Sequence, residues 1–282
     1  MDLAPIAHLH PSFDDEHGLL VLDLHHGKAN EMGTAELDAF DALCELIEQA
    51  SEIRCLVTTS RRRSSKGKPI FIAGANVKER VGWDDAKVKA HVRRQRDLMV
   101  RLRHLPIFTI ALASGVTLGW GVEFLLTADY VLATAEASFG LPETGLGILP
   151  GARGTAELAH LVGPNQALRL GCTAERIGLD EALRIGLVQE ATADVEAGLE
   201  RSRKLAGAVA RNSPTAVAAF KQAVLAGLGR PESVRLELEA RAYEHCVDHG
   251  EAAIGRSHFE ATLRGGTPPW GPRRVPAAPS DT

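Results

Sequence analysis

The chain has 282 residues and is 45% hydrophobic, which is enough to bury a large core. Its 32 lysines and arginines face 36 aspartates and glutamates, so the net charge of −4 argues against general nucleic-acid binding. No apolar run is long enough for a membrane span, and the N-terminal segment lacks the apolar stretch of a secretory signal. The cysteines are scattered, without a C-x-x-C motif, and the composition therefore predicts a cytoplasmic protein with reduced thiols.

The first two thirds of the chain alternate apolar runs with amphipathic helical patterns. Continuous apolar runs, typical of strands buried on both faces, occupy residues 19–24, 54–59, 107–112 and 130–135. Segments 33–51 and 84–105 carry apolar residues at three- and four-residue spacing, which predicts helices, and the second stops at Pro106. Strands alternating with helices predict an α/β fold.

Strand patterns end near residue 195. From there to residue 264 the chain has helical patterns only, and its final segment is rich in proline and glycine. We therefore divide the chain into a core of residues 1–194, a helical region of residues 195–264 and a loose tail of residues 265–282.

Two glutamates stand out because of what surrounds them. Glu123 lies in the apolar stretch "GWGVEFLLTADY", and Glu143 lies in "LPETGLG" beyond the next strand. Two carboxyl groups that converge on one cavity can divide general-base and general-acid work. The alternatives are that Glu123 caps a helix or pairs with an arginine, and that Glu143 is a solvated loop residue.

Two turns built from small residues precede helices. The turn in "FIAGANVKE" (71–79) can expose a backbone N–H to a ligand, although an ordinary strand-to-helix connection has the same pattern. "GILPGARGTAEL" (147–158) is neither a phosphate-binding Walker loop nor a dinucleotide fingerprint, because it lacks both spacings.

In order and spacing, residues 71–79, 113–158 and 168–190 together resemble the crotonase (enoyl-CoA hydratase/isomerase) superfamily. The similarity spans roughly residues 15–265, and "GKANEMG" (27–33) is similar to that family's early CoA-contacting segment. The resemblance implies an α/β crotonase fold, a spiral of ββα units with a helical C-terminal region that forms trimers, often paired into hexamers.

The resemblance also implies an acyl-CoA thioester as substrate, with no cofactor besides the coenzyme A that the substrate carries. It assigns an oxyanion hole to the backbone N–H groups of Ala75 and Trp120, which would polarise the thioester carbonyl. Glu123 would help to activate a water for attack at Cβ, and Glu143 would deliver a proton at Cα. The remaining substrate contacts would come from Lys28, Ala29, Lys68, Ala73, Lys78 and Gly151.

The sequence departs from the family pattern at several positions. Trp120 stands where glycine is frequent, and its indole must shape the acyl pocket or pack on the next layer. Arg153 replaces a glycine of "PGAGGT", where it could bind a carboxylate or keto group of the substrate, lower the pKa of a nearby glutamate, or face outward to a surface partner. The basic loop 61–68 could steer the anionic CoA or be a plain surface loop. The N-terminal histidines lack metal-ligand spacing, so no metal is expected.

These features favour an enoyl-CoA hydratase, which adds water reversibly to a 2-enoyl thioester. The alternative is an isomerase or another crotonase reaction, such as hydration of a cyclic or branched dienoyl-CoA, or decarboxylation. Isomerases of the family typically use one carboxylate, so the pair of glutamates favours hydration. A non-catalytic acyl-CoA-binding or scaffold protein, with RNA contacts at the basic loop, is a further alternative.

Overall fold

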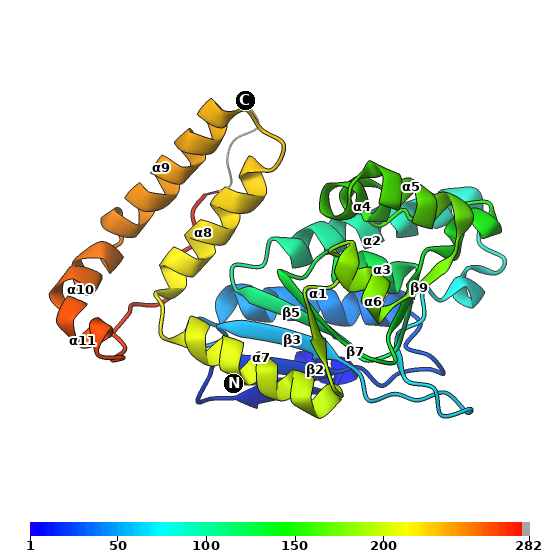
Figure 1. Cartoon of the computed structure of the whole chain (residues 1–282), viewed down its shortest axis with the longest axis horizontal. Coiled ribbons are helices and arrows are strands. Elements are labelled where there is room, and N and C mark those ends of the chain that lie inside the picture. The colour runs from blue at the N-terminus through cyan, green and yellow to red at the C-terminus, as the bar shows by residue number, and fades with distance from the viewer. Residues whose placement is uncertain (278–282) are drawn as a thin grey trace.

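The computed structural model describes residues 1–277, which form two sheets wrapped by helices (Figure 1). The larger sheet has six strands in the order β1-β2-β3-β5-β7-β10. All of its pairs are parallel except the antiparallel pair of β1 and β2. Its strands are β1 (Pro11–Asp14), β2 (Leu19–Asp23), β3 (Cys55–Thr59), β5 (Phe108–Ala113), β7 (Tyr130–Thr134) and β10 (Glu190–Thr192).

The smaller sheet has four strands in the order β4-β6-β8-β9. These are β4 (Ile70–Ile72), β6 (Val116–Leu118), β8 (Ser138–Gly140) and the antiparallel β9 (Arg176–Gly178). Each of the consecutive pairs β3/β4, β5/β6 and β7/β8 places one strand in each sheet, which gives the expected spiral. The α/β class predicted from the sequence is confirmed.

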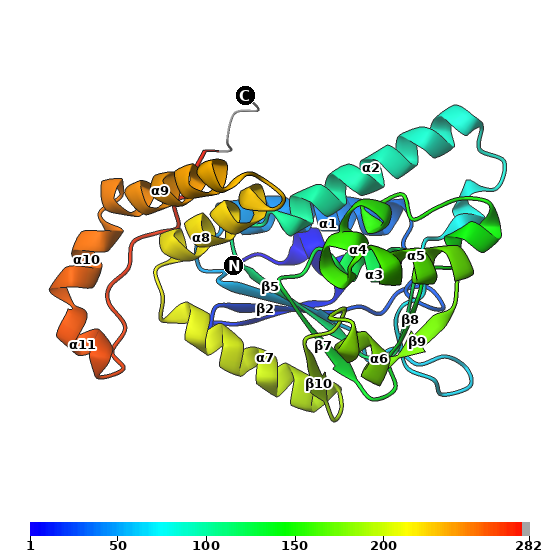
Figure 2. The same cartoon turned by 45° about the horizontal axis from the view of Figure 1, so that its top comes forward.

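Helices cover both sheets (Figures 1 and 2). Helix α7 (Val195–Ala210) packs on β3, β5, β7 and β10 of the larger sheet. The other core helices are α1 (Thr34–Gln49), α2 (Asp85–Arg103), α3 (Trp120–Leu125), α4 (Gly154–Val162), α5 (Pro164–Thr173) and α6 (Leu179–Arg184), with 3-10 helices η1 (Ala4–Leu9), η2 (Val77–Arg80) and η3 (Pro142–Leu146). Among residues 1–277, no helix combines the length and apolarity needed to cross a membrane.

The last helices project from one side of the core (Figures 1 and 2). They are α8 (Pro214–Gly227), α9 (Glu232–Asp248), α10 (Glu251–Ser257) and α11 (Phe259–Leu263). A buried ion pair holds α8 to the core, because Lys221 Nζ donates to the Asp129 carboxylate at 2.7 Å and to the Ile107 carbonyl at 2.9 Å. Arg103 donates to the same carboxylate at 2.9 Å.

One residue of the predicted tail, Arg273, is anchored to the core. Arg273 is only 8% exposed, and its guanidinium donates to the carbonyls of Ala50 and Ile53 at 3.1 and 2.9 Å and to that of Ile47. These carbonyls lie at and just beyond the end of α1, where a helix leaves carbonyls without intrahelical partners. The Pro/Gly-rich composition predicts that this segment lacks helices and strands, but it does not predict the hydrogen bonds of Arg273. Residues 278–282 of the predicted tail lie outside the described residues.

We expect Asp129→Asn to lower the free energy of unfolding by about 3 kcal/mol, because it leaves the Lys221 cation buried without a counter-charge. The matched control is Glu237→Gln, which breaks the exposed pair with Arg241 and costs less than about 0.5 kcal/mol. Urea unfolding at one fixed protein concentration measures both. Equal effects of the two substitutions would contradict the anchoring role of the buried pair.

Candidate active site

Glu123 lies in the first turn of α3 and is 3% exposed. Its Oε1 accepts hydrogen bonds from the backbone N–H groups of Ala152 and Gly154, both at 2.8 Å. Within residues 1–277, no donor bonds its Oε2. The carboxyl group therefore caps the start of α4 through one oxygen, as one of the sequence alternatives allowed, and it pairs with no arginine in the described residues. Its second oxygen has no bonded donor there and remains available.

Burial dominates the electrostatics of this group. It raises the pKa of Glu123 to about 7, although the two backbone donors and the Arg96 cation favour the charged form. The nearby Glu143 raises this pKa further by charge repulsion. A carboxyl that is half ionised near neutral pH can take or give a proton readily.

The loop from Pro150 to Gly154 is shaped around that carboxylate. A Cβ atom on Gly154 would lie 2.8 Å from Glu123 Oε1 and 2.7 Å from the Pro150 side chain, so only glycine fits. Arg153 precedes it with a φ of 82°, the left-handed region that glycine adopts freely. This backbone explains why a glycine is usual at the position of Arg153.

The Arg153 side chain is 13% exposed and pairs with Glu157 at 2.8 Å, one helical turn further on. Its Nε is buried and has no partner within the described part of the chain. The cation that acts on Glu123 is Arg96, so the idea that Arg153 lowers the pKa of that glutamate is not supported. Its contact with substrate stays a prediction.

Glu143 lies in η3, directly beside the start of α3. A Cβ atom on Gly119, which has a φ of 53°, would lie 2.6 Å from Glu143 Oε1. Its Oε2 is buried without a hydrogen-bond partner in residues 1–277, and burial raises its pKa. Glu143 is therefore not a solvated loop residue, and its environment favours the protonated form.

The predicted oxyanion-hole residues follow neighbouring parallel strands. Met32 donates to the Gly74 carbonyl at 2.9 Å and accepts from Asn76 N–H at 2.7 Å, so the N–H of Ala75 points away from Met32. Trp120 is the first residue of α3, where N–H groups have no intrahelical acceptor.

Two glycines show how closely these turns meet. A Cβ atom on Gly121 would lie 2.3 Å from the Ile72 carbonyl, and one on Gly74 would lie 3.5 Å from the Leu118 carbonyl. The start of α3 therefore lies directly against the end of β4. This contact brings the Ala75 and Trp120 turns together.

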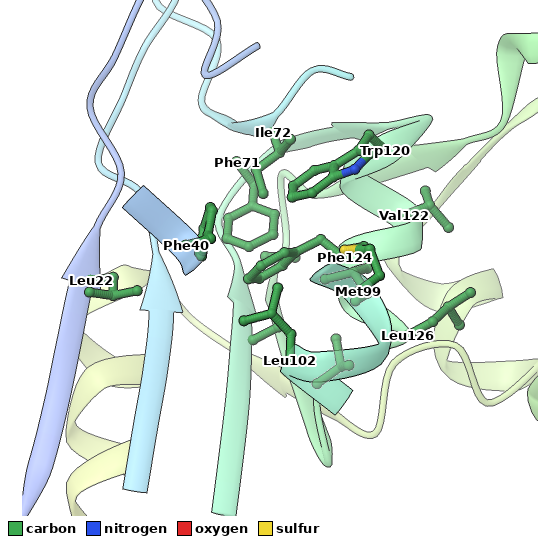
Figure 3. Close-up of a cluster of buried hydrophobic side chains, with 14 of the residues drawn as sticks. Leu22, Phe40, Phe71, Ile72, Met99, Leu102, Trp120, Val122, Phe124 and Leu126 are labelled. Atoms are coloured by element: carbon green, nitrogen blue, oxygen red, sulfur yellow. The ribbon is translucent and has the colours of Figure 1, made fainter. Parts of the chain in front are cut away.

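The Trp120 side chain packs into the core. The indole is 2% exposed, and its ring centroid lies 5.6 Å from that of Phe124 and 6.2 Å from that of Phe40. Figure 3 shows Phe71 beside this group. Of the two possibilities for the indole, packing on the next layer is the one observed.

The predicted CoA-contacting segment pairs with the Ala75 turn, since Ala73 N–H donates to the Ala29 carbonyl at 3.1 Å. Lys28, Lys68 and Lys78 are exposed, as phosphate-binding lysines would be. Gly151 accepts a hydrogen bond from Arg96 at 3.0 Å through its carbonyl.

One residue of this region was missed by the sequence analysis. Asn30 is fully buried, and its amide donates to the carbonyls of Leu24 and Phe71 and to the Ser60 hydroxyl. Its Oδ1 accepts from His26 N–H at 3.0 Å. A lone asparagine in a glycine-containing loop carries no signal that distinguishes this role from a surface turn.

The basic loop is folded, and its arginines have partners. Arg61 pairs with Asp23 and Glu196, Arg62 donates to the Gly27 carbonyl, and Arg63 lies 3.6 Å from Glu136. Paired arginines make a weaker anion-steering surface than the sequence suggested.

Comparisons with known proteins show the family to which the chain belongs. The family model described as enoyl-CoA hydratase/isomerase matches residues 15–270. The crystal structure of an enoyl-CoA hydratase from Bacillus anthracis superposes with a TM-score of 0.81 at 31% identity, covering 90% of this chain and 95% of that one. The short-chain-enoyl-CoA hydratase of Clostridium acetobutylicum is 32% identical over 83% of this chain and 87% of its own. The human mitochondrial enoyl-CoA hydratase domain-containing protein 2 is 34% identical over 77% of this chain and 75% of its own.

The fold is thus that of the crotonase superfamily, shared with solved enoyl-CoA hydratases. Within that superfamily, the chain belongs to the enoyl-CoA hydratase/isomerase family.

We expect Glu123→Gln to stabilise the protein at alkaline pH. The folded-state pKa of about 7 lies above the ordinary 4.5, so the stability that this group contributes is complete at acidic pH and is lost as the pH rises through 7. A glutamine amide has no charge to desolvate, and its oxygen can still accept both backbone hydrogen bonds. Denaturant unfolding at pH 5 and pH 8.5 should show a relative gain of up to about 3 kcal/mol at the higher pH.

The matched control for this prediction is Glu45→Gln, an exposed helical glutamate. It should show no such pH-dependent gain. A Glu123→Gln variant whose stability relative to wild type is the same at both pH values would contradict the buried, half-ionised state of Glu123.

Proposed function

We propose that the protein is an enoyl-CoA hydratase, a hydro-lyase that adds water reversibly to a 2-enoyl-CoA thioester. The observation that carries the proposal is the pair of neighbouring carboxyl groups at the start of α3, the buried Glu123 and the half-buried Glu143, whose pKa values are both raised by burial. Similarity to a short-chain-enoyl-CoA hydratase supports the same reaction. An isomerase needs only one such group, so the pair favours hydration.

In the proposed mechanism the thioester oxygen lies between the N–H groups of Ala75 and Trp120. Glu123, ionised, accepts a proton from water through Oε2 while the water oxygen bonds to Cβ. The Cα–Cβ π electrons move toward the thioester, and the two backbone donors stabilise the enolate-like charge. Glu143 then gives its proton to Cα, and proton exchange with solvent restores both carboxyls. Gly151 is proposed to help position the water.

An apolar cavity of about 360 Å³ lies next to residues that neighbour the two glutamates, although neither glutamate lines it, and it is proposed to hold the acyl chain. Its lining includes Gly154, whose N–H bonds Glu123, and Thr144, which follows Glu143. The remaining lining residues are uncharged, with Leu149, Leu158 and Leu168 among them. Such a lining suits a hydrocarbon chain.

The coenzyme A part of the substrate would run over the exposed Lys28, Lys68 and Lys78, with Ala29 and Ala73 beneath it.

For assembly, we propose a homotrimer or a hexamer of paired trimers that forms through the projecting C-terminal helices. Exposed Phe220, Tyr243 and Phe259 on these helices support an interface there. A cytoplasmic location stays a prediction.

We expect Glu123→Gln and Glu143→Gln each to lower kcat by at least about 100-fold, because each removes a proton-transfer group. Loss of the absorbance of the conjugated thioester measures the rate, and mass spectrometry of the product should show a gain of one water. The wild-type kcat/KM should rise with pH through about 7, as Glu123 ionises. Wild-type rates in both variants would refute the two-glutamate mechanism, and a product of unchanged mass would identify an isomerase.

We expect the enzyme to prefer uncharged over carboxylated enoyl groups, because Glu157 neutralises Arg153 and the cavity lining lacks charge. In Arg153→Gly this preference should be unchanged. A wild-type preference for carboxylated substrates that disappears in Arg153→Gly would instead make Arg153 a substrate-binding residue. Glu157→Gln serves as the complementary variant, since it frees the guanidinium.

A further inference from the structure

Three side chains from separate elements form a cluster beside the N-terminal 3-10 helix η1. His8 belongs to η1, His26 follows β2, and Glu36 lies in the first turn of α1. One nitrogen of each histidine and one carboxylate oxygen all lie within 4.8 Å of one another. His8 Nε2 is 2.7 Å from Glu36 Oε1, and the two imidazole rings stack with centroids 5.7 Å apart.

His26 is the unusual member of this cluster. Its side chain is buried at 7% exposure, yet neither ring nitrogen has a hydrogen-bond partner within residues 1–277. Buried polar groups without partners are rare because each loses its hydrogen bonds to water. A neutral imidazole has one ring nitrogen with a free lone pair, which is the atom that ligates metals.

Glu36 is held in place by a second contact. It is 8% exposed, and its Oε2 accepts a hydrogen bond from Gly33 N–H at 2.7 Å. Its Oε1 is thereby turned toward the two histidines. Such an outer contact on one carboxylate oxygen is the usual way in which proteins orient a ligating carboxylate.

We propose that His8, His26 and Glu36 bind a divalent transition-metal ion, with zinc as the best fit. Two imidazoles and one carboxylate are a ligand set that zinc takes, with a water in the fourth position. Zinc bonds of about 2.0–2.2 Å in a tetrahedron separate ligand atoms by about 3.3–3.6 Å. The 2.7 Å contact between His8 and Glu36 would open slightly, and the remaining pairs of ligand atoms, which lie within 4.8 Å, would adjust to the same spacing. His8 is 45% exposed, which gives the ion and the water a route from solvent.

The ion would cross-link three parts of the chain. It would join η1 to the loop after β2 and to the start of α1. Met32, which pairs with the backbone on both sides of Ala75, lies in the segment between His26 and Glu36. The proposed site lies apart from the two glutamates, and it does not depend on the reaction proposed above.

From sequence spacing we expected no metal at these histidines, and the proposed site differs from that expectation. The ligands lie 18 and 10 residues apart along the chain, and adjacent His25 and His10 obscure the relevant pair. His25 instead makes a 2.9 Å contact with Arg62, and its ring packs on that of His10. His25 is therefore the natural matched control.

The test uses untagged, EDTA-treated protein titrated with Co²⁺ and then with Zn²⁺. We expect one equivalent of Co²⁺ to give visible absorption bands of a tetrahedral site without a thiolate charge-transfer band, and Zn²⁺ to displace it and raise the Tm. Loss of an outer-shell partner alone costs about 10–100-fold in metal affinity, so His8→Gln and His26→Gln should weaken binding at least about tenfold. His8→Gln is the safer variant for folding, because that side chain is partly exposed.

His25→Gln should bind as tightly as wild type. The proposal is overturned if wild-type protein binds no Co²⁺ beyond weak surface association. It is also overturned if binding persists in His8→Gln and His26→Gln, or if His25→Gln alone abolishes it, since the ion would then sit on the surface pair.

Discussion

The structure depends on one constraint: the Glu123 carboxyl group is buried, and the backbone must supply its donors. One oxygen accepts from Ala152 N–H in the preceding loop and from Gly154 N–H at the first residue of α4, which fixes where that helix begins. The same requirement excludes a side chain at Gly154 and places Arg153 in a left-handed conformation. Two donors do not offset the desolvation fully, so the pKa stays near neutrality. Burial of this carboxyl group lowers stability, but it also gives the near-neutral pKa that acid–base chemistry needs.

The spiral explains why distant residues meet. Ala75, Trp120 and Glu143 each follow the carboxyl end of a strand, namely β4, β6 and β8, which are parallel neighbours in the smaller sheet. Parallel neighbours align these ends along one edge, where open α/β sheets place their ligands. These strands have only three residues each, so their ladders are short. Close glycine contacts, such as Gly121 against the Ile72 carbonyl, add to the alignment.

The sequence predicted the larger sheet well and the smaller sheet poorly. Runs such as 54–59 and 130–135 are long and apolar enough to identify β3 and β7, whereas β4, β6 and β8 are too short for a periodic signal. Glu123 was recognisable because an acid in an apolar run is costly. Its donors at Ala152 and Gly154 were not, because backbone groups carry no sequence signal. For the same reason, the sequence did not predict the contacts of Arg273, whose hydrogen-bond partners are backbone carbonyls more than 200 residues away.

Trp120 shows how packing and chemistry are joined in this protein. Its N–H belongs to the proposed oxyanion hole, while its indole packs with Phe40 of α1 and Phe124 of α3, with Phe71 of β4 against Phe124 (Figure 3). A glycine here would supply the same N–H but would leave the space beneath α3 unfilled, and cavities let neighbouring groups shift. The large side chain therefore ties the start of α3 to both α1 and β4. Ala75 follows β4, and Trp120 begins α3, so the aromatic cluster connects the two elements that carry the proposed oxyanion-hole donors. The distance between the Ala75 and Trp120 N–H groups therefore depends on core packing as well as on the two turns.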